Sequence, residues 1–144
     1  MTIKIQQDNA KPHIPSKIHN VKEHGTSDGW NIEVVNQPPN SPDLNVLDLG
    51  FFNSIQTLQH EKAPTNIDEL VAAVEEAYWE QDPETVNNIF LTQQKVMECV
   101  MKSEGKNNYK LPHMNKKQLS KLGKLPMSVV CSEEAIQVAL EKMG

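Results

Sequence analysis

The chain has 144 residues, of which 38% are hydrophobic, 5% aromatic and 23% charged, with a formal net charge of −5. This length fits one ordinary domain, and the composition excludes a collagen, a disulfide-stapled miniprotein and a fully disordered tail. The longest apolar run covers residues 70–74, far short of the roughly 20 residues that a membrane span needs. We therefore expect a soluble intracellular protein without a secretory signal.

The cysteines bear on the cellular compartment, and the basic residues bear on phosphate binding. Cys99 and Cys131 stand 32 positions apart without a C-x-x-C motif, which suits a reducing compartment. All 14 basic residues are lysine. Because arginine is the better bidentate partner for phosphate, its absence is unusual for a protein that binds phosphate groups.

Two strands are predicted in the first part of the chain. The alternation of Ile3 and Ile5 predicts a short strand over residues 2–7, which a turn-prone stretch ends. Residues 31–37 predict a second strand, which a pair of prolines ends. Because the segment between them is long enough for a crossover, we expect the two strands to pair in parallel.

The connecting segments carry weaker signals. A short helix is expected over residues 15–21, and a glycine-flanked loop over residues 25–29. Residues 38–42 contain three prolines, which predict an extended connector outside both sheet and helix.

From residue 44 onward, the apolar residues recur with the spacing of an α-helix. Spacings of three and four place a set of residues on one face of the first helix: Asp48, Phe52, Ile55 and Gln59. A last helix is expected over residues 132–143. Four of its residues are expected to face inward: Ile136, Ala139, Leu140 and Met143.

Two further helix starts have capping signals. Asn66 with Glu69 three places later resembles a capping box, and Asp82 before Pro83 is a cap residue followed by proline at the first helical position. We expect the apolar stripes of these helices to be core: Ile67, Leu70, Val71, Val74 and Tyr78 on the first, and Val86, Ile89, Phe90, Val96, Met97, Val100 and Met101 on the second.

Charge is unevenly distributed along the chain. Residues 61–101 carry nine acids against two lysines, whereas residues 102–125 carry seven lysines against Glu104 alone. Such a basic segment is either a contact for nucleic acid or a solvated face that balances the acidic helices. Residues 105–108 are the best candidate for a linker.

Two aspartates stand where metal chemistry is plausible. Asp8 follows the first predicted strand, at the end of a sheet where α/β proteins bind ligands, and Asp48 opens the helix after the second strand. Mg²⁺ prefers such carboxylate oxygens. Aspartates at strand ends and helix starts also serve as turn and cap residues, so position by itself leaves both readings open.

The sequence around both aspartates adds a stronger signal. Q-Q-D-N-A-K-P-H spans Gln6–His13, and P-P-N-S-P-D-L-N-V-L-D-L-G-F-F spans Pro38–Phe52. Both blocks closely resemble signature blocks of mariner-like transposases, which belong to the DDE superfamily of RNase H-like nucleases. The 39 residues between Asp8 and Asp48 match the plant-type spacing of that family, and Y-K-L-P-H-M-N-K at Tyr109–Lys116 resembles its C-terminal region.

The resemblance implies a fold, a reaction and a site. It implies a partial RNase H-like α/β fold with two parallel strands and about four to five helices. It implies that Asp8 and Asp48 are catalytic aspartates and ligands of Mg²⁺ or Mn²⁺. The implied reaction on DNA is nicking at transposon ends, then attack of a freed 3′-hydroxyl on target DNA, which are both phosphoryl transfers. The implied location is the nucleus.

The chain also departs from the family pattern. Family members open the catalytic domain with strands that bear a first aspartate, whereas the seven residues before Asp8 contain no acid. We therefore expect a transposase fragment with an incomplete metal site that is inactive alone. Residues 1–104 would be the C-terminal portion of the catalytic domain, and residues 105–144 a lysine-rich linker and final helix. An unpaired strand edge would favour marginal stability or self-association.

We keep two other interpretations of the chain. It is alternatively a non-catalytic remnant that binds nucleic acid or a full-length transposase, or a pseudogene product without a selected role. The candidate DNA contacts are six lysines: Lys106, Lys110, Lys116, Lys117, Lys121 and Lys124. The spacing of His13, His19 and His24 fits no zinc site.

Overall fold

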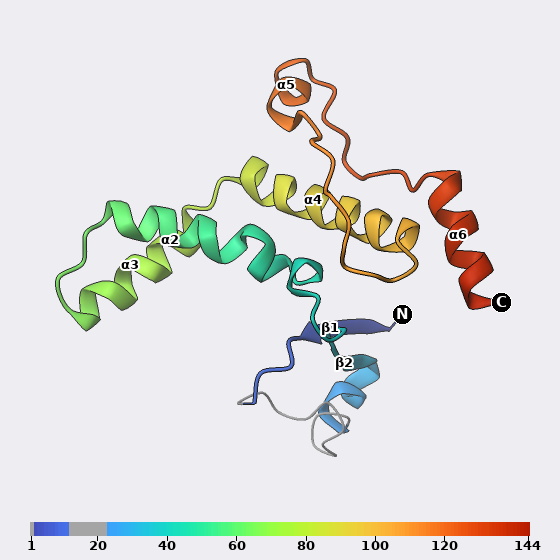
Figure 1. Ribbon diagram of the computed structural model, residues 1–144. Coiled ribbons are helices and arrows are strands. Elements are labelled where there is room, and N and C mark those ends of the chain that lie inside the picture. Colours follow the sequence, from blue (N-terminus) through green and yellow to red (C-terminus); the bar gives the residue numbers. More distant parts are fainter. Residues whose placement is uncertain (1, 12–22) are drawn as a thin grey trace. The chain divides into compact units, whose positions relative to one another are not determined.

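The computed structural model describes residues 2–11 and 23–144 (Figure 1). It divides the chain into two compact units, Met1–Ser41 and Pro42–Gly144. The expected mixed α/β architecture, with two parallel strands and a mostly helical remainder, is confirmed. The helix expected over residues 15–21 lies outside the described residues.

The first unit is built on two short parallel strands, β1 (Ile3–Gln7) and β2 (Ile32–Asn36). Ile3 pairs with Ile32, and the register continues along both strands. Gly25 packs so tightly against β2 that an added Cβ would lie 2.5 Å from the Ile32 carbonyl oxygen, which explains why this position has no side chain. The sheet is therefore anchored by the segment that leads into its second strand.

The connecting segments differ from the expectation. The loop expected over residues 25–29 contains a turn of 3-10 helix, η1 (Ser27–Gly29). The extended connector expected over residues 38–42 is wrong in part, because residues 39 and 40 form a turn and Asn40 has a φ of 56°. Asparagine is one of the few residues that tolerate this left-handed conformation.

The second unit does not begin with one continuous α-helix. A 3-10 turn, η2 (Pro42–Leu44), is followed by a π-helical turn, η3 (Leu47–Phe51), which runs directly into α2 (Phe52–Glu61). The set expected to share one face is divided between two kinds of helix, because Asp48 lies in the π turn whereas Phe52, Ile55 and Gln59 lie in α2. Asp48 and Phe52 are exposed, whereas the next two members of that set are half-buried.

Capping places the starts of α3 (Ile67–Trp79) and α4 (Pro83–Lys102) where the sequence predicts. The Asn66 side chain accepts a hydrogen bond from the Glu69 amide at 2.9 Å. Asp82 accepts hydrogen bonds from two amides in the first turn of α4, at 3.2 and 3.0 Å. Both caps satisfy amide groups that a helix leaves without internal partners.

The C-terminal part adds two helices, α5 (Lys116–Lys121) and α6 (Glu133–Met143). The sequence predicts α6, which Ser132 caps by accepting a hydrogen bond from the Ala135 amide at 3.4 Å. It does not predict the short α5. Within the second unit, α3 packs on α2, and α6 packs on α4 (Figure 1).

The apolar stripe expected to bury α3 is not core. All five of its members are exposed: Ile67, Leu70, Val71, Val74 and Tyr78. The residues of α3 that are buried are Ala73 and Ala77, which are 5% and 0% exposed. The fully buried face of α3 is therefore its alanine face, while Tyr78 of the exposed stripe still contacts Phe51 edge to face, with the ring centroids 6.1 Å apart.

The core expectations for α4 and α6 hold in part. Val96 is buried as expected, with Leu91, Glu98 and Cys99, but Phe90 and Met97 are exposed. On α6, Ala135 is buried, whereas three residues expected to face inward are exposed: Ile136, Leu140 and Met143. Within the described ranges, no helix has the length and apolar character needed to cross a bilayer.

Candidate functional site

Asp8 stands directly after β1, in the first unit. Its Oδ1 accepts a hydrogen bond from the Ala10 amide at 2.8 Å, which forms a local turn around the carboxylate. The neighbouring Asn9 donates from Nδ2 to the Gln37 carbonyl oxygen at 2.9 Å, just beyond the end of β2. This contact ties the two strand ends together, so that the Asp8 backbone is fixed at the carboxyl edge of the sheet.

Asp48 lies in the π-helical turn of the second unit. Its side chain is exposed, and its Oδ2 accepts a hydrogen bond from Asn45 Nδ2 at 2.8 Å. Asn45 Oδ1 in turn accepts from the Leu47 amide at 3.1 Å. Among the described residues, Asn45 alone donates a side-chain hydrogen bond to this carboxylate. Asn45 therefore orients Asp48 and leaves its other oxygen available to a ligand.

Three contacts hold the segment that carries Asp48 against the rest of the second unit. The Tyr109 hydroxyl donates a hydrogen bond to Asp43 Oδ2, and Gln93 of α4 donates from Nε2 to the Leu44 carbonyl oxygen at 3.0 Å. An added Cβ on Gly50 would lie 3.2 Å from Ile89 Cγ1, so backbone and helix approach closely there. The Asp48 turn is thus a supported element rather than a free loop.

The two aspartates belong to different units, Asp8 to the first and Asp48 to the second. In residues 2–11 and 23–144, no three His, Cys, Asp or Glu side chains form a group that could hold a metal ion. The donor chemistry of each aspartate fits a hard divalent cation, because carboxylate oxygens are the ligands that Mg²⁺ and Mn²⁺ prefer.

The candidate lysines divide into two groups. Lys116 donates from Nζ to the Asn88 carbonyl oxygen at 2.6 Å and to Thr92 Oγ1, both on α4. Partial burial lowers the pKa of the Lys116 ammonium, because desolvation disfavours its charge. Lys106 lies 3.7 Å from a Glu104 carboxylate oxygen. These two lysines are therefore already engaged within the second unit.

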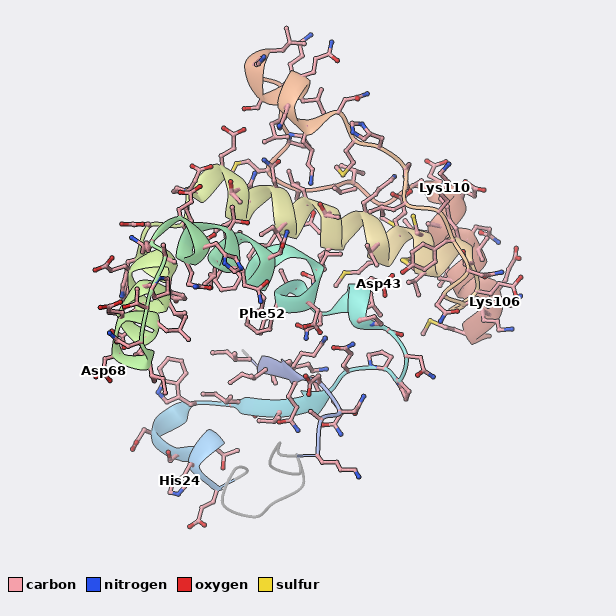
Figure 2. All side chains as sticks on the ribbon, turned by 60° about the vertical axis from the view of Figure 1, so that its left-hand side comes forward. His24, Asp43, Phe52, Asp68, Lys106 and Lys110 are labelled. Atoms are coloured by element: carbon pink, nitrogen blue, oxygen red, sulfur yellow. The ribbon has the colours of Figure 1, made fainter. Side chains whose placement is uncertain are left out.

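Like Lys106, the other four candidate lysines are exposed: Lys110, Lys117, Lys121 and Lys124. Figure 2 shows one of them, Lys110, with Lys106 on the segment that follows α4. Lys117 and Lys121 lie one turn apart on α5, and Lys124 follows that helix. In the part of the chain that the structure describes, no carboxylate lies within ion-pair distance of these four side chains. They are available to an anionic partner.

The histidines do not add a site. His24 is exposed, and His13 and His19 lie outside the described residues. The residues that the sequence did not single out are Asn45 and Tyr109. Asn45 had a detectable signal, since it stands three places before Asp48, whereas nothing local indicates that Tyr109 contacts Asp43, 66 positions earlier.

The chain was compared with known proteins at three levels. No protein-family model, no curated protein and no solved structure matches it. The functional assignment therefore depends on the two sequence blocks and on the geometry of the residues around them.

Proposed function

We propose that this chain is part of the catalytic domain of a mariner-like transposase with an RNase H-like fold, and that Asp8 and Asp48 bind Mg²⁺ or Mn²⁺. The observation that carries the proposal is the pair of signature-like blocks around two aspartates, separated by 39 residues. The same proposal makes DNA the partner and the nucleus the location.

The local geometry supports both aspartates as ligands. Asp8 follows a strand of a parallel pair, where α/β sheets present ligand-binding groups, and Asp48 has a carboxylate oriented by Asn45. When bound, divalent ions stabilise the charge on the attacking and leaving oxygens of a phosphoryl transfer. Each carboxylate supplies an oxygen ligand of the kind that such ions take, so metal binding is the first property to measure.

Metal binding is tested by titrating the full chain with Mn²⁺ and following free Mn²⁺ by electron paramagnetic resonance. We expect Asp8→Asn and Asp48→Asn each to weaken the binding by about tenfold or more, because each substitution removes a charged oxygen ligand. Asp68→Asn is the matched control, since it removes an exposed carboxylate from the first turn of α3. Mg²⁺ should displace the bound Mn²⁺.

Equal Mn²⁺ affinity in all three variants would reject the proposed ligands. Incubation of the same proteins with duplex DNA and Mg²⁺ addresses catalysis directly. Strand cleavage that is lost in Asp48→Asn would show that this chain also carries out the reaction, whereas binding of Mn²⁺ without cleavage agrees with a partial site.

A second candidate function is nucleic-acid binding without catalysis. It is favoured by the five exposed lysines of the segment after α4, because no acidic residue stands between positions 105 and 132. Each phosphate contact releases counterions and steepens the salt dependence of binding by about 0.9 in the slope of log K against log salt. Neutralising Lys117 and Lys121 should therefore flatten the slope by about 2, and Asp8→Asn should leave it unchanged.

A further inference from the structure

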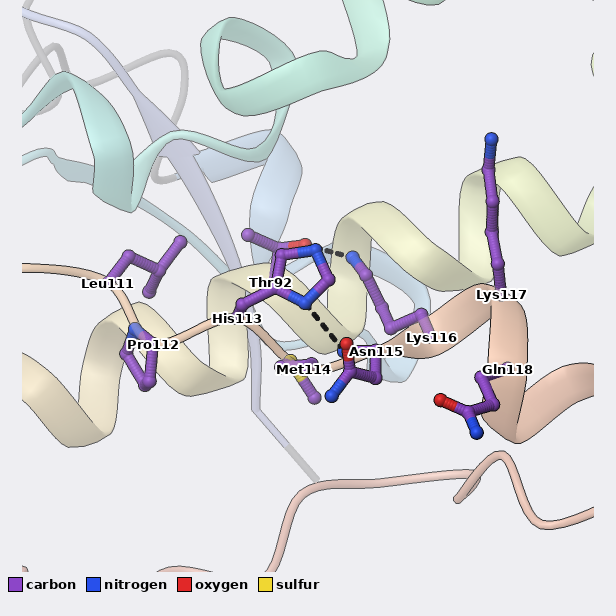
Figure 3. Close-up of a pocket in the computed structure, with 9 residues that line it drawn as sticks. All are labelled: Thr92, Leu111, Pro112, His113, Met114, Asn115, Lys116, Lys117 and Gln118. Carbon is purple, nitrogen blue, oxygen red and sulfur yellow. Dashed lines mark hydrogen bonds between the residues drawn. The ribbon is translucent and has the colours of Figure 1, made fainter.

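A cavity of about 540 Å³ lies in the second unit between α4 and the segment that leads into α5 (Figure 3). Thr92 of α4 lines one side, and residues 111–118 form the rest. Its volume falls in the range of sites that take small molecules, about 300–1,000 Å³. Two of its residues, Lys116 and Lys117, are among the candidate DNA contacts, whereas the sequence does not indicate a cavity there.

The segment around the cavity is held in place. Asn115 adopts a left-handed φ of 51°, and its amide donates a hydrogen bond to His113 Nδ1 at 3.1 Å. The Lys116 ammonium is tied to Thr92 on α4, as Figure 3 shows, and it also donates to the Asn88 carbonyl oxygen. Since the loop is fixed at both of these points, the cavity is formed without a ligand.

Three groups of the cavity can donate hydrogen bonds or supply positive charge: Lys116, His113 and Lys117. An ammonium has three N–H donors, and Lys116 uses two of them on α4, so that one is left for a ligand. Because His113 Nδ1 accepts the Asn115 amide, Nε2 is the ring nitrogen that can donate a hydrogen bond to a ligand. The exposed Lys117 adds positive charge at the rim. This set favours an anion.

Part of the remaining lining is apolar, next to the polar Thr92, Asn115 and Gln118. Leu111, Pro112 and Met114 form the apolar part, and a methionine thioether makes favourable contacts with aromatic rings. An anionic group next to a flat apolar surface is the combination that a nucleotide presents, with its phosphate and its base. A base can reach such a cavity when it is unpaired, because pairing and stacking hold it inside a duplex.

We propose that this cavity binds one unpaired nucleotide of a DNA strand, with the phosphate at His113 and Lys116 and the base against Pro112 and Met114. The choice of DNA rests on the proposed function, and charge complementarity supports it independently: residues 105–132 contain six lysines and no acid. Binding of a phosphate would also offset the cost of holding the Lys116 ammonium partly out of water.

The test uses the full chain and a fluorescein-labelled oligo(dT) of about ten nucleotides, followed by fluorescence anisotropy. We expect tighter binding to the single strand than to a duplex of the same length. His113→Ala and Met114→Ala should each weaken binding of the single strand by about tenfold. Lys142→Met, on α6, removes one positive charge outside the cavity and should change the affinity less than about twofold.

The position of the ligand is read from methyl NMR of the methionines. The Met114 methyl signal should shift on addition of oligo(dT), while the signals of the exposed Met127 and Met143 stay unchanged. Equal weakening by Lys142→Met, or shifts confined to other methionines, would overturn the proposal. A Met114 shift with free dTMP but not with oligo(dT) would assign the cavity to free nucleotides and reject the DNA strand.

Circular dichroism of each variant shows whether it folds, and Met114→Ala provides a second variant that leaves the Lys116 contacts intact. The Mn²⁺ titration separates this proposal from the one on which it rests. Mn²⁺ binding that depends on Asp48, without a Met114 shift, leaves the proposed function standing and rejects the nucleotide site. A Met114 shift without Mn²⁺ binding supports the nucleotide site and rejects the proposed function.

Discussion

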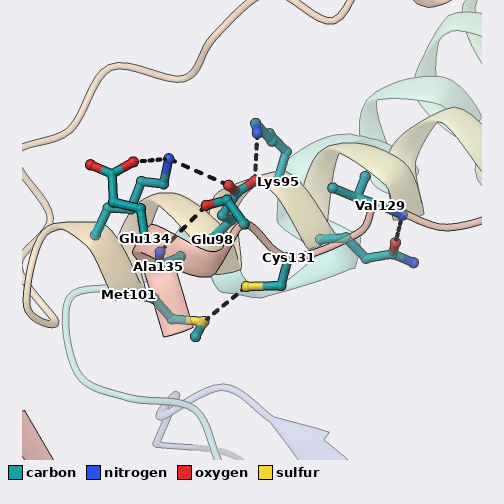
Figure 4. A network of polar contacts seen from close by, with 10 residues as sticks. Lys95, Glu98, Met101, Val129, Cys131, Glu134 and Ala135 are labelled. Carbon is teal, nitrogen blue, oxygen red and sulfur yellow. Dashed lines mark hydrogen bonds and ion pairs between the residues drawn. The ribbon is translucent and has the colours of Figure 1, made fainter. Parts of the chain in front are cut away.

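Glu98 offers the sharpest test of how the second unit is held together. Its side chain is 4% exposed on α4, and it accepts a hydrogen bond from Lys95 one turn earlier. Lys102 Nζ lies 3.5 Å from its other oxygen, and the Ser132 side chain at the start of α6 also hydrogen-bonds to it. Figure 4 shows Glu98 with its partner Lys95. We predict that Glu98→Gln destabilises this unit by loosening α6 from α4.

The magnitude follows from the pKa of the carboxyl group. The hydrogen bond from Lys95, then that from Ser132, and the charges of Lys95 and Lys102 lower the pKa of Glu98 from 4.5 to about 2. This difference corresponds to about 3 kcal/mol in favour of the folded, ionised form. Because the folded pKa lies below the unfolded one, this stabilisation is complete above about pH 5 and is lost as the pH falls towards 2.

The assay is urea unfolding of the full chain, followed by far-ultraviolet circular dichroism at pH 7 and at about pH 3. We expect Glu98→Gln to lower the free energy of unfolding by about 2–3 kcal/mol at pH 7, and by about half of that at the lower pH. Glu134→Gln is the control, because Glu134 also pairs with Lys102, at 2.7 Å, but is 72% exposed. It should cost less than about 1 kcal/mol. The reasoning would be refuted if Glu98→Gln lowered the free energy of unfolding by the same amount at both pH values.

Three further substitutions test local features of the second unit. Asn66→Ala removes the acceptor for the Glu69 amide and should lower the free energy of unfolding in urea by about 1 kcal/mol; an unchanged midpoint would contradict the cap. Tyr109→Phe removes the hydrogen bond to Asp43 and should cost about 1 kcal/mol, with faster amide hydrogen exchange around Asp48 as its local sign; unchanged exchange would speak against this support. Ala63→Gly relieves a positive φ of 46° and should raise Tm, with a gain of up to about 1 kcal/mol; a lower Tm would disprove the strain.

The elements that the sequence predicts well are those that neighbouring residues decide. The start of α3 depends on Asn66 and Glu69, and the start of α4 depends on Asp82 and Pro83, all within four positions of the helix they cap. Because a cap residue and the amide that it binds are only two or three positions apart, the sequence pattern is sufficient to predict where the helix begins. The π turn at Asp48 has no such signature, and the sequence therefore predicts an ordinary helix there.

Local sequence patterns also predict where some residues of the candidate site lie. The positions of Asp8 after a strand and Asp48 on a helical turn follow from local patterns. The state of Lys116 does not, because its partners Asn88 and Thr92 stand 28 and 24 positions away on α4. As a result, Lys116 differs from the other candidate lysines, because its ammonium is engaged on α4 and it lines a cavity.

The sequence by itself determined the strands, the helix starts and the uneven charge of this protein, since each depends on residues a few positions apart. The tertiary structure decided which faces are buried. α3 carries a wide apolar stripe, yet Ala73 and Ala77 are the residues buried where it packs on α2. Periodicity shows that a helix has an apolar face, but the choice of the face that meets a neighbour depends on the shape of that neighbour. The same physical reason explains the Tyr109–Asp43 contact and the cavity beside α4, which exist because distant segments fold against each other.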